Sequence, residues 1–243
     1  MASPALIAIV CSDRHRNGKT LLARLLVDHL LLEERDPYCL DLSHPEGGQR
    51  AFFPGRTALV DFSTVPGQMK VFDTILSRPG RDYVIDVPAP LLARFCELAL
   101  DLDVCEAARE KGFRIAVFYV VDKAQTSLRA AVAAEELLLP DLFVPVANRH
   151  VGSSLPKHLP GPAVYLERFD AALQEIIANR RFSLRAFLLG DEAAVPEELR
   201  ANLRNFLDSA VAGLRDLEPA FSLRALRLGE VSQKLFEHGH GHR

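Results

Sequence analysis

The chain has few of the features that mark a secreted or zinc-binding protein. Its four cysteines, Cys11, Cys39, Cys96 and Cys105, are scattered along 243 residues, and no pair has the spacing of a CxxC zinc motif. This pattern favours buried thiols in a reducing compartment over a disulfide framework. The N-terminus also lacks the basic start and cleavage site of a secretory signal. We therefore expect a cytoplasmic protein.

Long hydrophobic runs and a strong charge bias are missing too. The apolar run from Ala5 to Cys11 is far shorter than the roughly 20 residues that cross a bilayer. The formal net charge of −3 gives no general reason to expect nucleic-acid binding. Hydrophobic residues make up 49% of the chain, which is ample for the core of one large α/β domain.

Apolar runs alternate with segments of helical periodicity. Strands are expected at residues 5–11, 38–42, 57–62, 81–86, 113–121, 142–147 and 163–166. Helices are expected from residue 19 onward and at residues 67–76, 91–111, 126–138, 169–179, 197–217 and 220–236. This alternation predicts a mostly parallel sheet with helices on both faces. We expect residues 1–180 to form this domain, 181–236 to be its C-terminal helical extension, and 237–243 to be a disordered His-rich tail.

The stretch between the first strand and the first helix has the form of a phosphate-binding P-loop. A polar loop closes on Gly18-Lys19-Thr20, where helical periodicity begins. In such a unit the loop N–H groups and the helix dipole bind phosphate, the lysine reaches the β- and γ-phosphates, and the threonine hydroxyl helps to hold Mg²⁺. Asp13 stands where the usual pattern has its first glycine. The nucleotide-binding residues expected in this stretch are Asn17, Gly18, Lys19, Thr20 and Leu21.

Polar residues also follow the later strands, and ligands bind beyond the carboxyl ends of parallel strands. Asp86 ends an apolar strand, as a Walker B carboxylate does, and is the expected Mg²⁺ ligand beside Thr20. Asp41 is expected near the metal or a water molecule, and Asn148 is expected to hydrogen-bond a nucleobase edge. Each of these three residues can instead be a turn residue. The other polar residues placed at this edge are Ser43, Asp122, Lys123 and Arg149.

These pieces together resemble the ParA/MinD-like, or deviant Walker A, branch of P-loop ATPases. The resemblance lies in the loop Arg14–Thr20, in Leu40-Asp41-Leu42, in the YVIDVP segment that contains Asp86, and in Asn148-Arg149. It spans roughly residues 5 to 178. It implies ATP and Mg²⁺ as ligands, a nucleotide-dependent homodimer, and a role in partition, positioning or regulation of a protein partner. It also implies that the Asn-Arg pair faces the adenine, and that Lys19, Arg14 and Asp41 are the catalytic residues.

The chain departs from the family pattern at several positions. Arg14 replaces the signature lysine that reaches the partner's nucleotide, and His15 and Arg16 replace paired glycines. Arginine has a planar fork in place of a compact ammonium, so the first change is not conservative. Ser43 replaces a second aspartate that relatives use near the attacking water. The resemblance therefore implies nucleotide binding with slow hydrolysis.

Two other functions stay open. Dethiobiotin-synthetase-like enzymes share this architecture and have an Asp in the loop, similar to Ser12-Asp13, although the chain lacks their Gly-Thr-Asp start. That resemblance implies an ATP-dependent synthetase or kinase acting on a small carboxylic acid. The third function is a degenerate P-loop protein that serves as an interaction module.

The C-terminal end adds two weaker candidates. Residues 221–236 are apolar with interleaved charges, and we favour packing on the domain or on a partner over a position on a membrane surface. The tail HGHGHR could bind a divalent metal, but a disordered tail is the favoured interpretation.

Overall fold

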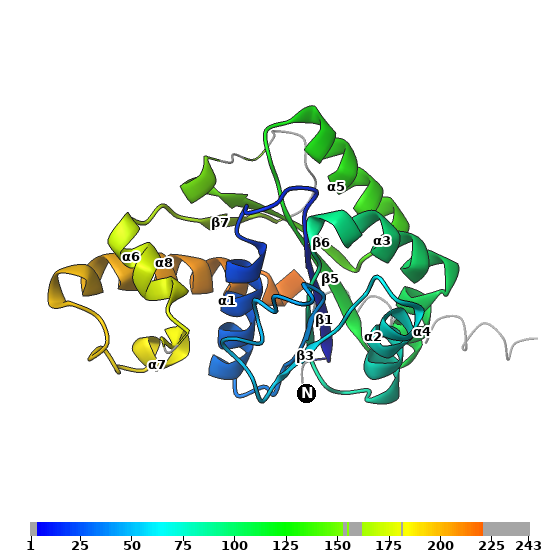
Figure 1. Ribbon diagram of the computed structural model, residues 1–243, viewed down its shortest axis with the longest axis horizontal. Coiled ribbons are helices and arrows are strands. Elements are labelled where there is room, and N and C mark those ends of the chain that lie inside the picture. The colour runs from blue at the N-terminus through cyan, green and yellow to red at the C-terminus, as the bar shows by residue number, and fades with distance from the viewer. Residues whose placement is uncertain (1–3, 153–154, 156–161, 181, 221–243) are drawn as a thin grey trace, which may run out of the picture.

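A parallel sheet with strand order β3-β2-β4-β1-β5-β6-β7 lies at the centre of the molecule (Figure 1). The computed structural model describes residues 4–152, 155, 162–180 and 182–220. The strands are β1 (Leu6–Cys11), β2 (Tyr38–Asp41), β3 (Thr57–Leu59), β4 (Tyr83–Asp86), β5 (Arg114–Val120), β6 (Leu142–Asn148) and β7 (Val164–Leu166). All paired neighbours run parallel.

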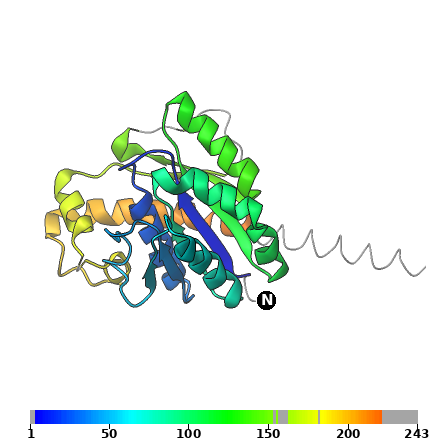
Figure 2. The ribbon, with the colours of Figure 1, turned by 45° about the vertical axis from the view of Figure 1, so that its right-hand side comes forward.

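Helices cover both faces of this sheet (Figure 2). They are α1 (Lys19–Leu32), α2 (Val65–Ser77), α3 (Leu92–Asp101), α4 (Val104–Glu110), α5 (Gln125–Leu138), α6 (Ala171–Ala178), α7 (Leu184–Leu188) and α8 (Glu197–Arg215). The described residues also form two single-turn 3₁₀ helices, η1 (Ala89–Leu91) and η2 (Arg149–Val151). The predicted parallel α/β sheet with helices on both faces is confirmed.

Successive strand residues point to opposite faces, so each strand contributes to two separate cores. In β1, Ala8 and Val10 join a core beneath α1, α6, α7 and α8, whereas Ile7 and Ile9 join a core beneath α2, α3, α4 and α5. A strand covered on both faces reads as a continuous apolar run. This is why the strands of this chain are visible in its sequence as runs, without alternation of polar and apolar residues.

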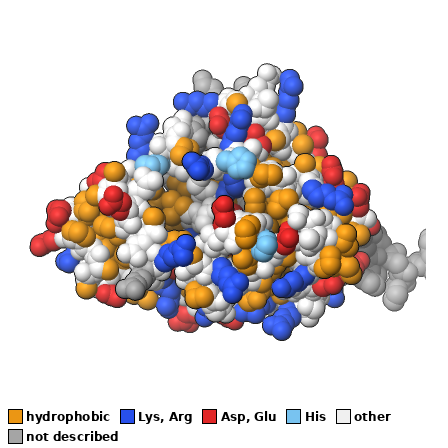
Figure 3. Space-filling view, in the orientation of Figure 1, with side chains coloured by type: hydrophobic (Ala, Val, Ile, Leu, Met, Phe, Trp, Pro, Cys, Tyr) orange, Lys and Arg blue, Asp and Glu red, His pale blue; other side chains and the backbone are white. Residues whose placement is uncertain are grey.

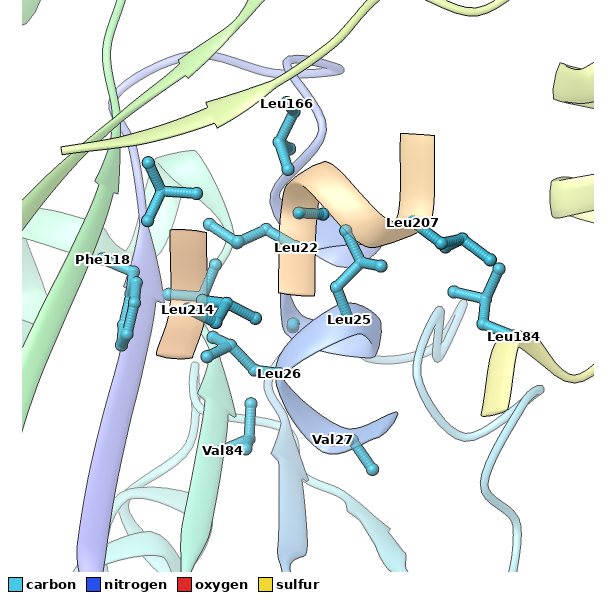
Figure 4. Packing of buried hydrophobic residues seen from close by; sticks show 14 of the residues in the cluster. Leu22, Leu25, Leu26, Val27, Val84, Phe118, Leu166, Leu184, Leu207 and Leu214 are labelled. Carbon is cyan, nitrogen blue, oxygen red and sulfur yellow. The ribbon is translucent and has the colours of Figure 1, made fainter. Parts of the chain in front are cut away.

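Helix α1 is the most enclosed helix of the first core. Ten of its 14 residues are buried, among them the polar residues Arg24, Asp28 and His29, so most of the helix surface lies in the interior. Leu22, Leu25 and Leu26 lie between the sheet and α8, where they face Leu207 and Leu214 (Figure 4). The burial fixes α1, and with it the loop at its N-terminus, relative to β1.

Apart from shifts of one to three residues at element ends, the largest at β3, which ends at Leu59 and not at residue 62, the structure differs from the sequence-based expectation in two helical regions. The single helix expected over residues 91–111 is interrupted, because Asp103 has a positive φ of 50° and separates α3 from α4. The short helix α7 was not predicted; the side chain of Ser183 caps it by accepting from the Ala186 N–H. The expected helix at 220–236, apart from Ala220, and the His-rich tail lie outside the described residues. Among the helices described, none is long and apolar enough to span a bilayer.

Candidate functional site

The loop between β1 and α1 lies at the carboxyl edge of the sheet, beside the ends of its two neighbours β4 and β5. Gly18 caps α1 with a left-handed φ of 98°. A Cβ at this position would lie 2.3 Å from Nδ2 of Asn148. Both the backbone conformation and the available space therefore require glycine at the entrance to the helix.

Lys19 is the first residue of α1 and is 8% exposed. Its ammonium donates to the carbonyl oxygen of Arg14 and to Oδ1 of Asn17, at 3.2 Å for the latter. Burial lowers the pKa of Lys19, and the nearby carboxylates of Asp86 and Asp13 oppose this shift. The positive charge thus lies within the loop, at the N-terminus of a helix, where an anion is favoured.

Thr20 and Asp86 form the second element of the site. The hydroxyl of Thr20, in the first turn of α1, donates to Oδ2 of Asp86 at 2.8 Å, and Asp86 ends β4, the parallel neighbour of β1. The pKa of Asp86 is raised to about 7 by burial, with a smaller contribution from the charge of Asp41, while the hydrogen bond from Thr20 and the charge of Lys19 oppose the rise. Hydroxyl and carboxylate oxygens are suitable Mg²⁺ ligands. A bound cation would favour the ionised carboxylate.

No group of three or more His, Cys, Asp or Glu side chains suited to a metal occurs among the residues that the structure describes. Mg²⁺ is commonly held by one or two protein groups, with phosphate oxygens and waters completing its octahedron. The Thr20–Asp86 pair therefore fits a cation that arrives with a phosphate ligand, and it does not form a closed protein cage.

Asp41 is fully buried at the end of β2. Its carboxylate accepts four hydrogen bonds, from the N–H and hydroxyl of Ser43 and from the N–H groups of Gln49 and Arg50. The side chain of Gln49 then donates to the backbone oxygen of Thr20. Asp41 thus folds the β2–β3 loop against the start of α1, and it lies opposite Asp86 in the sheet register.

Asp13 is directed at β5 and α5. Its Oδ1 accepts from the hydroxyl groups of Tyr119, at 3.0 Å, and Ser127, and its own N–H donates to the Tyr119 oxygen at 3.1 Å. Ser12 strengthens the same attachment, since its hydroxyl donates to the Val120 carbonyl at 2.7 Å. The residue that replaces the usual glycine therefore ties the loop to the neighbouring strand.

Arg14 lies on the same side of the loop. Its guanidinium donates to the hydroxyl of Thr126 at 2.9 Å and forms ion pairs with Asp13 at 3.3 Å and Asp122 at 3.8 Å. The side chain is 40% exposed. In this conformation its charge is matched by carboxylates of its own chain.

The two residues at the end of β6 point in different directions. The amide of Asn148 donates to the backbone oxygen of Asn17 at 2.9 Å and accepts from the His150 N–H at 3.0 Å. Arg149 instead forms a bidentate pair with Glu167, at 2.7 and 2.9 Å. Its guanidinium lies 4.8 Å from the centre of the Tyr165 ring. The structure therefore brings Asn148 to the loop, whereas Arg149 lies over β7.

A cavity of about 240 Å³ opens beside Gly18, Thr20 and Leu21. One wall is formed by the rings of His150 and Phe169, which stack with centres 4.4 Å apart and planes inclined by 7°. The face shown in Figure 3 is hollowed beside hydrophobic side chains, with Lys, Arg and His side chains above the hollow. An apolar pocket with a few polar groups beside an anion-binding helix terminus suits a ligand that is aromatic at one end and anionic at the other.

Arg24 also lines this cavity and is 2% exposed. Its guanidinium lies 3.9 Å from the centre of the Phe52 ring and donates to the carbonyl oxygens of Ile177, at 2.5 Å, and Phe182. Arg24, Phe52, His150 and Phe169 were not among the sequence-predicted site residues. The one sequence signal among them is Arg24, a basic residue between the apolar residues at 21–23 and 25–27.

The fold and the site together define a parallel α/β protein with a P-loop-like strand–loop–helix unit. No protein-family model matches the sequence, and no curated protein sequence matches it significantly. A solved structure similar to this chain is a nucleotide-binding protein from Archaeoglobus fulgidus in complex with ADP. The two share 12% sequence identity with a TM-score of 0.45, over 73% of this chain and 87% of that chain. Similarity at this level does not bear on function.

Proposed function

We propose that this protein binds ATP with Mg²⁺ and acts as a ParA/MinD-like P-loop NTPase. The observation that carries the proposal is the hydrogen bond from Thr20, at the start of α1, to Asp86, at the end of β4, beside the buried side chain of Lys19. A hydroxyl, a carboxylate and a lysine at the start of one helix are the groups that P-loop proteins use for a metal-bound polyphosphate.

Each part of the nucleotide has a matching part of the site. The loop N–H groups, the N-terminus of α1 and Lys19 would bind the phosphates, and Thr20 and Asp86 would hold Mg²⁺. The cation would supply neutralisation of the phosphate charge. The cavity beside Leu21 would take the nucleoside, with the base against the ring of His150.

The proposal extends to an ATP-dependent homodimer that positions or partitions a cargo, or regulates a partner. Arg14 is the residue proposed to act across the dimer, since it is partly exposed. To do so it would have to exchange its pairing with Asp122 for the partner's nucleotide. Hydrolysis is proposed to be slow, because the carboxylate of Asp41 is engaged by the β2–β3 loop and Ser43 stands where relatives have a second carboxylate.

Calorimetric titration with Mg-ATP tests the proposal. The wild type should bind, and Lys19→Ala should lose at least tenfold in affinity, because a charge-assisted contact to phosphate contributes about 1.5–3 kcal/mol. Lys111→Ala is the matched control: Lys111 is exposed and follows α4, near the start of β5 at the opposite edge of the sheet. Equal affinity in all three proteins would contradict the assignment of Lys19.

The same titration separates the alternatives. If millimolar Mg-ATP gives neither heat of binding nor a thermal shift, the degenerate P-loop interaction module is the alternative that remains. Turnover that requires a small carboxylic acid would favour the synthetase or kinase. A protein that binds Mg-ATP yet sediments as a monomer at saturation would refute the dimer, and Arg14→Ala should weaken dimerisation more than it weakens ATP binding.

A further inference from the structure

Asn148 is buried at the end of β6, with 3% of its surface exposed. Both ends of its side-chain amide are used within the protein. Nδ2 donates to the backbone oxygen of Asn17, and Oδ1 accepts from the His150 N–H. The amide therefore joins the phosphate loop to the turn that carries one wall of the cavity.

The peptide that Asn148 supports is the one that enters α1. Nδ2 of Asn148 lies against Gly18, since a Cβ there would be 2.3 Å away. The side chain of Asn17 holds the rest of the loop: its Oδ1 accepts from Lys19, and its Nδ2 donates to Ser12 at 2.6 Å and to a carbonyl of β5 at 3.2 Å. One chain of hydrogen bonds thus runs from the His150 turn to the phosphate-binding lysine.

We infer that Asn148 is a positioning residue for the phosphate loop and does not select the nucleobase. The inference rests on the proposed function and changes the role expected for Asn148 within it. Base selection then belongs to the cavity, where the ring of His150 stacks on Phe169. Asn148 borders the cavity, but its amide bonds the backbone at both ends and only 3% of the residue is exposed, so a base edge has little access to it.

The inference predicts that Asn148 matters for a ligand that has no base. Asn148→Asp keeps the shape of the side chain but replaces the donor with an oxygen that faces the Asn17 carbonyl oxygen. The Asn17–Gly18 peptide would lose its support, and a buried acceptor would be left without a donor. Loss of one such bond corresponds to roughly tenfold in affinity or more.

The experiment compares magnesium tripolyphosphate, Mg-ATP and Mg-GTP by calorimetric titration. Asn148→Asp should weaken the binding of all three by a similar factor and leave the ATP-to-GTP ratio unchanged. His150→Ala is the comparison variant, because it removes the ring and keeps the backbone N–H that Asn148 accepts from. It should weaken ATP more than tripolyphosphate. An Asn148→Asp protein that binds tripolyphosphate normally, or has an altered ATP-to-GTP ratio, would overturn the inference.

A measurement on the wild type tests the inference even if the Asn148→Asp variant does not fold. The side-chain amide resonances of Asn148 should shift on addition of magnesium tripolyphosphate alone; a shift that requires ATP would refute the positioning role. If the wild type binds neither tripolyphosphate nor ATP, the proposed function fails and the inference fails with it. If the wild type binds both and only base preference changes in the variant, the inference fails alone.

Discussion

Asp28 should make the stability of this protein fall as the pH rises toward neutrality. The residue lies on α1, is 3% exposed, and its Oδ2 has no hydrogen-bond partner among the described residues. Burial raises its pKa from 3.8 to about 7, although the Arg24 charge and a hydrogen bond from the Arg185 backbone oppose the shift. Between these two pH values the folded state keeps a proton that the unfolded chain releases.

The magnitude follows from this difference in bound protons. The free energy of unfolding should fall by about 1.4 kcal/mol for each pH unit over which the two states differ by one proton. Across the roughly three units between the unfolded and folded pKa values, Asp28 accounts for about 4 kcal/mol. The contribution of Asp28 to the free energy of unfolding is fully present below pH 4 and is lost as the pH rises through 7.

Urea denaturation of the wild type and Asp28→Asn from pH 4.5 to 8 measures this effect. Asparagine keeps the shape of the side chain and does not titrate, so the difference between the two unfolding free energies isolates Asp28 from the other carboxyl groups. That difference should change steadily up to about pH 7 and then level off. Asp73→Asn, at an exposed position of α2, controls for the loss of a carboxyl group. Parallel curves for the wild type and Asp28→Asn would show that Asp28 is already ionised in the folded protein at acid pH, and the reasoning would be wrong.

Three further substitutions test other parts of the structure. Thr20→Val should weaken Mg-ATP binding at least tenfold in titration and destabilise the fold by about 1–3 kcal/mol in thermal melts, since Asp86 loses a hydrogen-bond donor. Thr20→Ser keeps the hydroxyl and should keep both the affinity and the stability of the wild type. Gly67→Ala should lower the free energy of unfolding in urea by about 2 kcal/mol or more, because its Cβ would lie 1.8 Å from a backbone oxygen. Gly55→Ala is the control: a Cβ there would have nothing within 4 Å, so stability should change by less than about 0.5 kcal/mol. Arg24→Met should cost about 3 kcal/mol and speed hydrogen exchange in α6, because Arg24 donates to the Ile177 carbonyl oxygen near the end of that helix. Unchanged exchange there would contradict that anchoring role.

The sheet and the loop between β1 and α1 could be predicted from the sequence because both depend on local patterns. A strand buried on both faces leaves an unbroken apolar run, and Gly18-Lys19-Thr20 follows one such run directly. Asp86 could be placed beside Thr20 because an apolar strand that ends in Asp after Gly-Lys-Thr resembles a Walker B element, and the two side chains are hydrogen-bonded. The break at Asp103 was missed, since helical periodicity continues on both sides of it.

The cavity could not be predicted from the sequence, because its walls come from segments far apart in the chain. Phe52 lies in a loop that Asp41 folds back over α1, and Phe169 precedes α6. Neither position has a local signature. Asn148 was identified as a site residue, but its contact with Asn17, 131 positions earlier in the chain, depends on how β6 and the loop meet in three dimensions.

The two edges of the sheet restrict how another molecule can join this protein. The edge strands β3 and β7 have three residues each, so each edge offers only a short row of backbone donors and acceptors to a further strand. Short edges of this kind discourage strand addition and the aggregation that follows from it. A dimer mate or other partner would therefore be recognised through side chains of helices and loops, where substitutions can tune the choice of partner without disturbing the sheet.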